Sequence, residues 1–256
     1  MTSAPPPLSG LRVLVTRPVD QASALVAALE AAGAVPVRYP TIRIAPPPSW
    51  DPLDQALARG DDAYDWVVFT SAAAVRHTLG RPNADVCARL AVAAVGRETA
   101  RALTAASLRV DVAPPPADER QEGLAAALAG LPPGTRILFP QALGGRPWLA
   151  ADLRSRGCMV DVVPAYETIP VVHASPPPPY DAATFASPSA LRVFVDAAGA
   201  QGLAAAIVAV IGPTTHALAD ELGVRVDVVA HEPGAAALVD ALADHILAAS
   251  THKGAR

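Results

Sequence analysis

The sequence contains a repeat, in which segments that are far apart match each other at a constant offset of 116 positions. For example, Tyr64 matches Tyr180 and Gly96 matches Gly212. The strongest matches are Tyr-Asp, Phe-x-Ser, Gly-x-x-Thr and Arg-Val-Asp-Val, which recur in the same order. Matches between alanines carry little weight in so alanine-rich a chain. Self-similarity at one fixed offset indicates that a single structural unit occurs twice. The fold must therefore accommodate two copies of the same arrangement.

A second repeat occurs at an offset of 124 positions, where Arg12 matches Arg136 and Gly33 matches Gly157. Each copy has the pattern of a short apolar strand, a helix closed by glycine and a second strand, which is a βαβ unit. We call the copies that repeat at the offset of 124 A and A′, and the copies that repeat at the offset of 116 B and B′, so the order along the chain is A, B, A′, B′. Strands that alternate with helices at this spacing predict an α/β fold, with parallel sheets flanked by helices on both faces.

Local signals set the expected limits of some elements. Asp20 is expected to cap a helix over residues 21–32, and Gly33 is expected to end it in a left-handed conformation. Residues 108–112, with the sequence Leu-Arg-Val-Asp-Val, are predicted to form a strand.

The amino-acid composition limits the number of domains and the kinds of partner that can be expected. A chain of 256 residues with 52% apolar residues is long enough to form two domains. A net charge of -4 and an aromatic content of 4% offer no basic surface or stacking platform, so we expect no nucleic-acid partner.

Cys87 and Cys158 lie outside any metal-ligand or disulfide spacing, so we expect no metal site and a reducing, cytoplasmic location. We find no secretion signal or bilayer-length apolar run, and expect no membrane association.

Helix starts are the candidate binding sites. Ligands of open parallel sheets bind beyond the carboxyl ends of the strands, and backbone N–H groups at helix starts attract anions. Ser71 and Ser187 are expected to cap helices there. The residues expected to bind anions at these helix starts are Ser71, Thr99, Ser187, Ser189, Thr214 and Thr215. Arg17 and Arg146 are candidate carboxylate partners. The alternative is that the hydroxyls only cap helices, which is worth ~1 kcal/mol each, and that the arginines only face solvent.

Tyr166, in the segment AYETIP, is the candidate for a chemical role. It lies beyond unit A′, where the chain must cross towards B′. A phenol can donate a proton or a hydrogen bond, although a tyrosine on a strand more often serves packing. The patterns GxGxxG, P-loop, GxSxG and HExxH do not occur, which argues against redox, kinase, serine-hydrolase and zinc-protease functions.

Taken in order, the segments VLVTRP, VVFTSAAAV, AVGRETA, ILFP, AYETIP, TFASPSAL and VIGPTTHAL resemble the uroporphyrinogen-III synthase family over nearly the whole chain. The resemblance implies two similar α/β domains joined by a two-stranded linker, with the second domain inserted in the first. Domain 1 would comprise residues 1–41 and 169–256, and domain 2 residues 45–165. A monomer is expected.

The activity implied by the resemblance is the cyclisation of hydroxymethylbilane, a linear tetrapyrrole, to uroporphyrinogen III. The terminal pyrrole ring is inverted, water is lost and no cofactor is used. Hydroxymethylbilane synthase could hand the substrate over. Carried over by motif, Tyr166 would assist departure of the hydroxyl, and the residues named above would bind the substrate carboxylates. Backbone N–H groups are expected to carry much of this binding.

Two positions depart from the pattern of the family. Gln141 and Ala142 stand where a basic or glycine-rich continuation is expected, and Gly234 and Ala235 stand where a hydroxyl residue is common. Each change would weaken one helix-start site. They leave open a second hypothesis, a non-catalytic relative that binds tetrapyrroles or other polyanions and acts in regulation.

Overall fold

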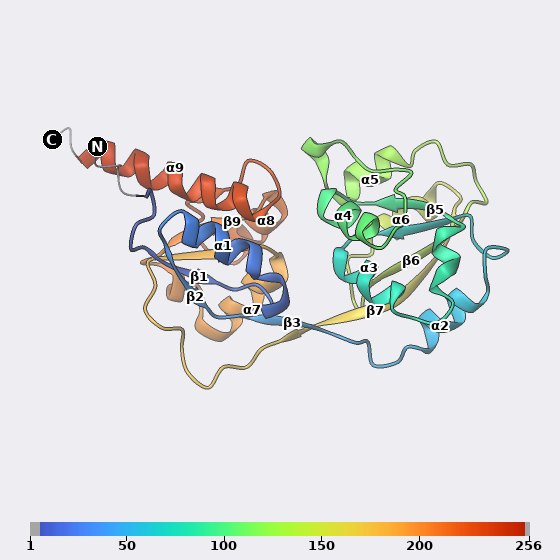
Figure 1. Cartoon of the computed structure of the whole chain (residues 1–256), viewed down its shortest axis with the longest axis horizontal. Coiled ribbons are helices and arrows are strands. Elements are labelled where there is room, and N and C mark those ends of the chain that lie inside the picture. Colours follow the sequence, from blue (N-terminus) through green and yellow to red (C-terminus); the bar gives the residue numbers. More distant parts are fainter. Residues whose placement is uncertain (1–5, 254–256) are drawn as a thin grey trace. The chain divides into compact units, whose positions relative to one another are not determined.

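The computed structural model describes the backbone of residues 6–253 and the side-chain environments of residues 6–249. It divides the chain into two compact units, coloured by sequence in Figure 1. Unit 1 contains Met1–Arg43 and Ile169–Arg256, and unit 2 contains Ile44–Thr168. Each unit has a sheet of five strands with helices on both faces, so the predicted α/β class with mainly parallel strands is confirmed.

The sheet of unit 1 has the strand order β10-β9-β8-β1-β2, and all neighbouring strands are parallel. Its strands are β1 (Arg12–Val15), β2 (Val35–Arg38), β8 (Ala182–Phe185), β9 (Ile207–Val210) and β10 (Val228–Val229). Its helices are α1 (Ser23–Ala31), α7 (Pro188–Ala198), α8 (Pro213–Glu221) and α9 (Ala235–Lys253), with short 3-10 turns at Val19–Gln21 and Ala200–Leu203.

The sheet of unit 2 has the order β3-β7-β6-β4-β5, in which β7, β6, β4 and β5 are parallel. Its strands are β3 (Ile42–Ala45), β4 (Trp66–Phe69), β5 (Ala91–Ala94), β6 (Arg136–Ala142) and β7 (Met159–Pro170). Its helices are α2 (Asp51–Ala58), α3 (Ala72–Leu79), α4 (Arg97–Ala105), α5 (Gln121–Ala127) and α6 (Trp148–Ser155), with 3-10 turns at Ala84–Ala88 and Pro116–Asp118.

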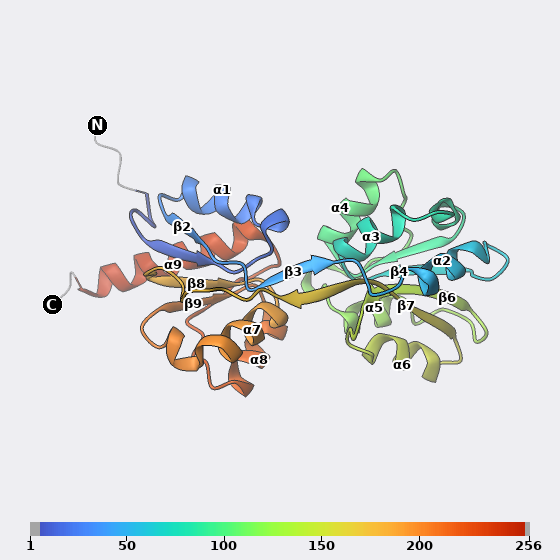
Figure 2. The same ribbon diagram turned by 90° about the horizontal axis from the view of Figure 1, so that it is seen from below.

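Alternation along the strands divides the core of each unit into two layers. In β1, Val13 and Val15 pack against α1 and α9, whereas Leu14 packs on the opposite face against α7 and α8. In β4, Val67 joins the layer under α2, α3 and α4, and Val68 joins the layer under α5 and α6. Figure 2 shows these helices on the two sides of each sheet. Period-two alternation of apolar residues thus buries both faces of each sheet.

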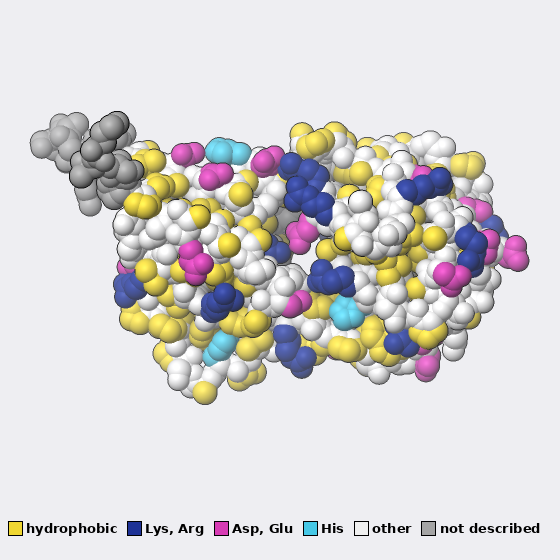
Figure 3. All heavy atoms as spheres, viewed as in Figure 1, with side chains coloured by type: hydrophobic (Ala, Val, Ile, Leu, Met, Phe, Trp, Pro, Cys, Tyr) yellow, Lys and Arg dark blue, Asp and Glu magenta, His cyan; other side chains and the backbone are white. Residues whose placement is uncertain are grey.

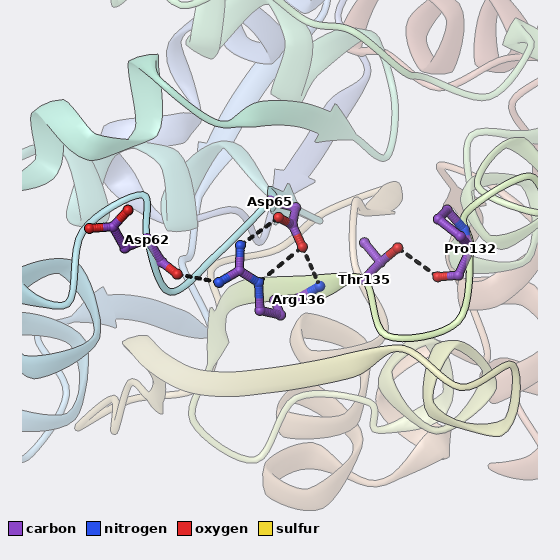
Figure 4. Close-up of polar contacts among 5 residues, drawn as sticks. All are labelled: Asp62, Asp65, Pro132, Thr135 and Arg136. Carbon is purple, nitrogen blue, oxygen red and sulfur yellow. Dashed lines mark hydrogen bonds and ion pairs between the residues drawn. The ribbon is translucent and has the colours of Figure 1, made fainter.

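An arginine–aspartate pair joins segments that are distant in sequence within each unit. In unit 2, Arg136 donates its Nη2 to Asp65 at 2.6 Å, and the same carboxylate accepts the backbone N–H of Arg136 at 2.8 Å (Figure 4). In unit 1, Arg12 bonds Asp181 in the same way, at 2.7 and 2.9 Å. The pairs join A to B′ and A′ to B. The repeats predicted from sequence therefore assemble crosswise.

Two expectations about local structure are wrong. Asp20 lies in a 3-10 turn, and α1 begins at Ser23 without a side-chain cap at Ala22. Residues 108–112 form only one bridge, from Val112 to Ala93, because the Asp111 carboxylate takes the N–H of Val92 at 2.8 Å. A side chain thus replaces part of the strand ladder. The predicted helix stop at Gly33 is confirmed, with φ at 84°.

The Arg12–Asp181 pair predicts a pH dependence of stability. Hydrogen bonds from the side chain and then the backbone N–H of Arg12 lower the pKa of Asp181 to about 2, from its ordinary 3.8. A depressed pKa adds stability that is fully present above the ordinary value and is lost as the pH falls through the folded one. Asp181→Asn should therefore be less stable than wild type at neutral pH, and this difference should shrink between about pH 4 and 2.

Urea unfolding at each pH measures this difference. Asp196→Asn is the matched control, because Asp196 is exposed on α7 and makes no ion pair among the residues that the structure describes. A deficit for Asp181→Asn that stays constant across the window would contradict the assignment.

Candidate functional site

The predicted site residues gather at one edge of each sheet, because the carboxyl ends of parallel strands lie at the same edge. In unit 2 this edge carries residues that follow β4, β5 and β6 or lie on β7, namely Ser71, Thr99, Arg146 and Tyr166. In unit 1 it carries residues that follow β1, β8 and β9, namely Arg17, Ser187, Ser189, Thr214 and Thr215.

The hydroxyl of Ser71 joins the start of α3 to Tyr166. Ser71 Oγ accepts the backbone N–H of Ala74 at 3.0 Å, which is the predicted helix cap. It donates its own proton to Tyr166 Oη at 3.1 Å. Because the phenol oxygen accepts this bond, its own proton remains available for another acceptor. Ser71 is thus a cap and a partner of Tyr166 at once.

The surroundings of Tyr166 keep its phenol neutral at physiological pH. Burial raises the pKa of Tyr166, while the hydrogen bond from Ser71 and the positive charge of Arg76 act in the opposite direction. Burial disfavours the phenolate, and a donor and a cation favour it. Tyr166 can therefore serve as a hydrogen-bond or proton donor whose anionic form is partly stabilised.

A β-bulge directs Tyr166 towards Ser71. In β7, Val163 and Ala165 belong to the layer under α3, so simple alternation would send Tyr166 to the other face. The pairing with β6 shifts here: Pro164 opposes Gln141, and Tyr166 opposes Ala142. One extra residue on a strand re-aims the side chains that follow it. Tyr166 consequently packs on the same layer as its neighbour Ala165.

Unit 1 contains the cap but not the phenol. Ser187 Oγ accepts the N–H of Ala190 at 3.2 Å, as Ser71 does in unit 2. At the offset of 124, the position of Tyr166 corresponds to Ile42, which is buried in the apolar layer with Ala190. The duplicated hydroxyls therefore have different surroundings, and only the one in unit 2 has a phenol as its partner in the described part of the chain.

The two glycine turns also differ. At Gly96, a Cβ would lie 2.7 Å from an oxygen of Glu119, whose carboxylate also accepts Nε of Arg97 at 2.7 Å. At Gly212, a Cβ would meet no described atom within 4 Å. An internal carboxylate thus lies against the start of α4, whereas the start of α8 is open. No sequence signal pointed to Glu119, since its contact depends on how the loop before α5 packs.

The predicted hydroxyl residues differ in their exposure. Thr99 and Thr215 are buried, with 3% and 1% of their surface accessible. Thr214 and Ser189 are exposed in the first turns of α8 and α7. At Thr99 and Thr215, the backbone N–H groups of the first helical turn are therefore better placed to donate hydrogen bonds to a ligand than the buried hydroxyls are.

The two predicted arginines lie at the expected edges. Arg146 forms an ion pair with Glu122 at 2.6 Å and lies 5.3 Å from the centre of the Trp148 ring. Hydrogen bonding from Arg146 lowers the pKa of Glu122. Arg17 is half-buried just beyond β1. On the face in view in Figure 3, basic side chains lie among acidic ones.

No group of three or more His, Cys, Asp or Glu side chains suited to a metal ion occurs within the described residues. Over the same part of the chain, no helix is both long and apolar enough to cross a membrane.

Residues 23–240 match the family model described as uroporphyrinogen-III synthase HemD. The chain belongs to the uroporphyrinogen-III synthase family. The family predicted from the sequence motifs is therefore confirmed.

The share of each relative's length that aligns with this chain differs between members of the family. Uroporphyrinogen-III synthase of Synechococcus elongatus is 40% identical over 169 residues, which cover 63% of this chain and 62% of the relative. The porphyrin biosynthesis protein HemD of Ruminiclostridium josui is 32% identical over 63% of this chain but only 33% of its own length. Uroporphyrinogen-III synthase of Chlorobaculum parvum is 29% identical over 85% of this chain and 92% of the relative.

Solved structures of the family share this fold. A mutant uroporphyrinogen III synthase from the extremely thermophilic bacterium Thermus thermophilus aligns with a TM-score of 0.65 and 20% identity, covering 93% of this chain and 100% of that one. The structure of the Helicobacter pylori protein aligns with a TM-score of 0.61 and 16% identity, covering 94% and 99%.

The hydrogen bond between Ser71 and Tyr166 predicts a change in titration. Ser71→Ala removes a donor that stabilises the phenolate, so the pKa of Tyr166 should rise further. Tyrosinate absorbance, read as the difference from the same protein carrying Tyr166→Phe, measures this pKa. Ser187→Ala is the matched control, because it removes the equivalent cap in unit 1. An unchanged pKa in Ser71→Ala would show that the bond is not formed in solution.

Proposed function

We propose that this protein is a uroporphyrinogen-III synthase, which cyclises hydroxymethylbilane to uroporphyrinogen III without a cofactor. Family membership supports the reaction class. The single structural observation that carries the proposal is the bond from Ser71 to Tyr166, since it leaves a neutral phenol with a proton to donate at the ligand-binding edge of the sheet.

Tyr166 assists the first step. The carbon–oxygen bond of the terminal hydroxymethyl group breaks as the pyrrole nitrogen supplies electron density. The departing hydroxyl takes the phenol proton and leaves as water, the pyrrole releases its N–H proton to solvent to give an azafulvene, and the phenolate regains a proton from solvent. Ser71 and Arg76 oppose the rise in pKa caused by burial, so they stabilise the transient phenolate. A positioned donor of this kind contributes roughly 10²–10⁴-fold in rate.

The later steps depend on the position of the substrate. The azafulvene carbon must be attacked by the substituted carbon of the terminal ring, which gives a spiro intermediate that opens and closes again with that ring inverted. The free position of the same ring is the competing nucleophile. Holding the chain so that only one attack is in reach is a matter of proximity and orientation.

Helix starts at the two sheet edges are proposed to bind the carboxylates of the substrate. The open turn at Gly212, with Thr214 and Thr215 in the first turn of α8, suits an anion. Ser187, Ser189 and Arg17 add polar groups to the same edge. Ser71, Thr99 and Arg146 belong to the edge of unit 2. Backbone N–H groups carry much of this binding. Thr99 and Thr215 can therefore contribute through their main chain although their side chains are buried.

The two units are proposed to be the two domains of the enzyme, with the second inserted in the first. The compact units change over at residues 43/44 and 168/169, close to the boundaries 1–41, 45–165 and 169–256 expected from sequence. β3 and β7 run across these changeovers and are neighbours in one sheet, which supports a two-stranded linker. The enzyme is proposed to act as a cytoplasmic monomer supplied by hydroxymethylbilane synthase.

The isomer composition of the product tests the proposed activity. Bilane generated in situ by hydroxymethylbilane synthase should give the type III isomer when this protein is present, as measured by chromatography of the oxidised porphyrins. Bilane without the protein closes to type I. If only type I forms while the protein binds bilane, a non-catalytic tetrapyrrole- or polyanion-binding relative is the correct description.

Tyr166→Phe tests the role of the phenol. The variant should form type III at least several-fold more slowly, because the hydroxyl loses its proton donor, while product binding stays close to that of wild type. Tyr180→Phe is the matched control, since it removes a phenol that donates to the carbonyl of Gly202 in unit 1. Turnover equal to wild type in Tyr166→Phe would remove Tyr166 from the mechanism.

A further inference from the structure

The ring of His77 stacks with that of Tyr166 in unit 2, and the ring of Trp50 lies next to that of His77. His77, in the last turn of α3, has its ring centroid 6.1 Å from that of Tyr166, with the ring planes inclined by 18°. Trp50, which precedes α2, lies 6.0 Å from His77 with an inclination of 34°. Both distances fall in the range where offset rings attract each other. Trp50, His77 and Tyr166 therefore form a column of three rings.

The outer end of this column is held by an ion pair. The Arg81 guanidinium carbon lies 4.3 Å from the centre of the Trp50 ring. Asp54, in α2, accepts Nε and Nη2 of Arg81 at 2.8 and 2.6 Å. A two-pronged bond between a guanidinium and a carboxylate fixes direction as well as distance. Arg81, held in place by Asp54 of α2, thus packs on the ring of Trp50.

The column restrains the orientation of the Tyr166 ring, which the hydrogen bond to Ser71 alone does not. That bond sets the distance from Tyr166 Oη to Ser71, but one hydrogen bond leaves the phenol ring able to pivot about its oxygen. A nearly parallel, offset ring at 6.1 Å between centroids opposes that pivot. The bulge in β7 makes the restraint more important, because Tyr166 lies where the regular pairing of the strand is interrupted.

We propose that His77 is a positioning residue, which holds the ring of Tyr166 in the plane that directs its proton to the departing hydroxyl. The proposal rests on the proposed function for the role of Tyr166. All three rings are partly buried, and Trp50 and Tyr166 pack against the apolar layer under α2, α3 and α4. Their stacked geometry, rather than the acid–base chemistry of the imidazole, is what positions Tyr166.

Steady-state kinetics of type III formation test the role in catalysis. His77→Ala should lower kcat about tenfold with KM little changed, since small losses of alignment are costly. His77→Phe, which keeps a flat ring, should stay within about twofold of wild type. In a Tyr166→Phe background, His77→Ala should cause no further loss, because the two residues act as one unit. His245→Ala, on α9, is the control and should keep the wild-type kcat.

Three results would overturn the proposal: His77→Phe as slow as His77→Ala, His77→Ala as fast as wild type, or the same loss from His77→Ala with and without the phenol of Tyr166.

A titration separates failure of this proposal from failure of the proposed function. In His77→Ala, water reaches one face of the Tyr166 ring, so its raised pKa should fall towards the ordinary value, whereas in His77→Phe it should stay raised. This readout needs no turnover. If wild type gives only type I isomer, the proposed function fails while the titration still tests the contact. A pKa of Tyr166 that is the same in both variants would show that His77 does not cover the ring.

Discussion

Two arginine–aspartate pairs bring together segments that are far apart in the chain. Arg12 bonds Asp181 across 169 positions, and Arg136 bonds Asp65 across 71. In each pair the carboxylate also takes the backbone N–H of the arginine at the first residue of a strand. The pairs place β1 beside β8 and β6 beside β4 in register. That register aligns the carboxyl ends of the strands, so the helix starts meet at one edge of each sheet.

The repeated segments give both units the same order of four strands, β9-β8-β1-β2 in unit 1 and β5-β4-β6-β7 in unit 2, but the edges of the two sheets differ. Unit 2 has Tyr166 where unit 1 has the buried Ile42. Its glycine turn is lined by Glu119, whereas the turn at Gly212 is open. The helix cap at Ser187 thus has no phenol as its partner among the described residues, whereas the cap at Ser71 is bonded to Tyr166. This difference is the basis for proposing different roles for the two edges.

Much of the fold could be predicted from the sequence because its causes are local. Alternating apolar residues, the glycine stops and the caps at Ser71 and Ser187 each act within a few residues. The family followed from the order of motifs. The strand at 108–112 was mispredicted because its pattern says nothing about the Asp111 carboxylate, which competes for the N–H of Val92.

The partners of the site could not be predicted, because they depend on tertiary packing. The bulge that turns Tyr166 towards Ser71 arises from the register between β6 and β7. The stacking of His77 and the approach of Glu119 to Gly96 each join elements with no common sequence pattern. Sequence reasoning found Tyr166 and Ser71 separately. Only the structure shows that they form one hydrogen-bonded unit.

The central claim is that this unit performs the chemistry while its counterpart in unit 1 only binds. The most direct measurement is the rate of type III formation by Ser71→Ala and Ser187→Ala at equal folded fraction, corrected for spontaneous type I. The account predicts that Ser71→Ala lowers kcat towards the value of Tyr166→Phe, whereas Ser187→Ala keeps kcat and raises KM. Equal values of kcat in the two variants would contradict it.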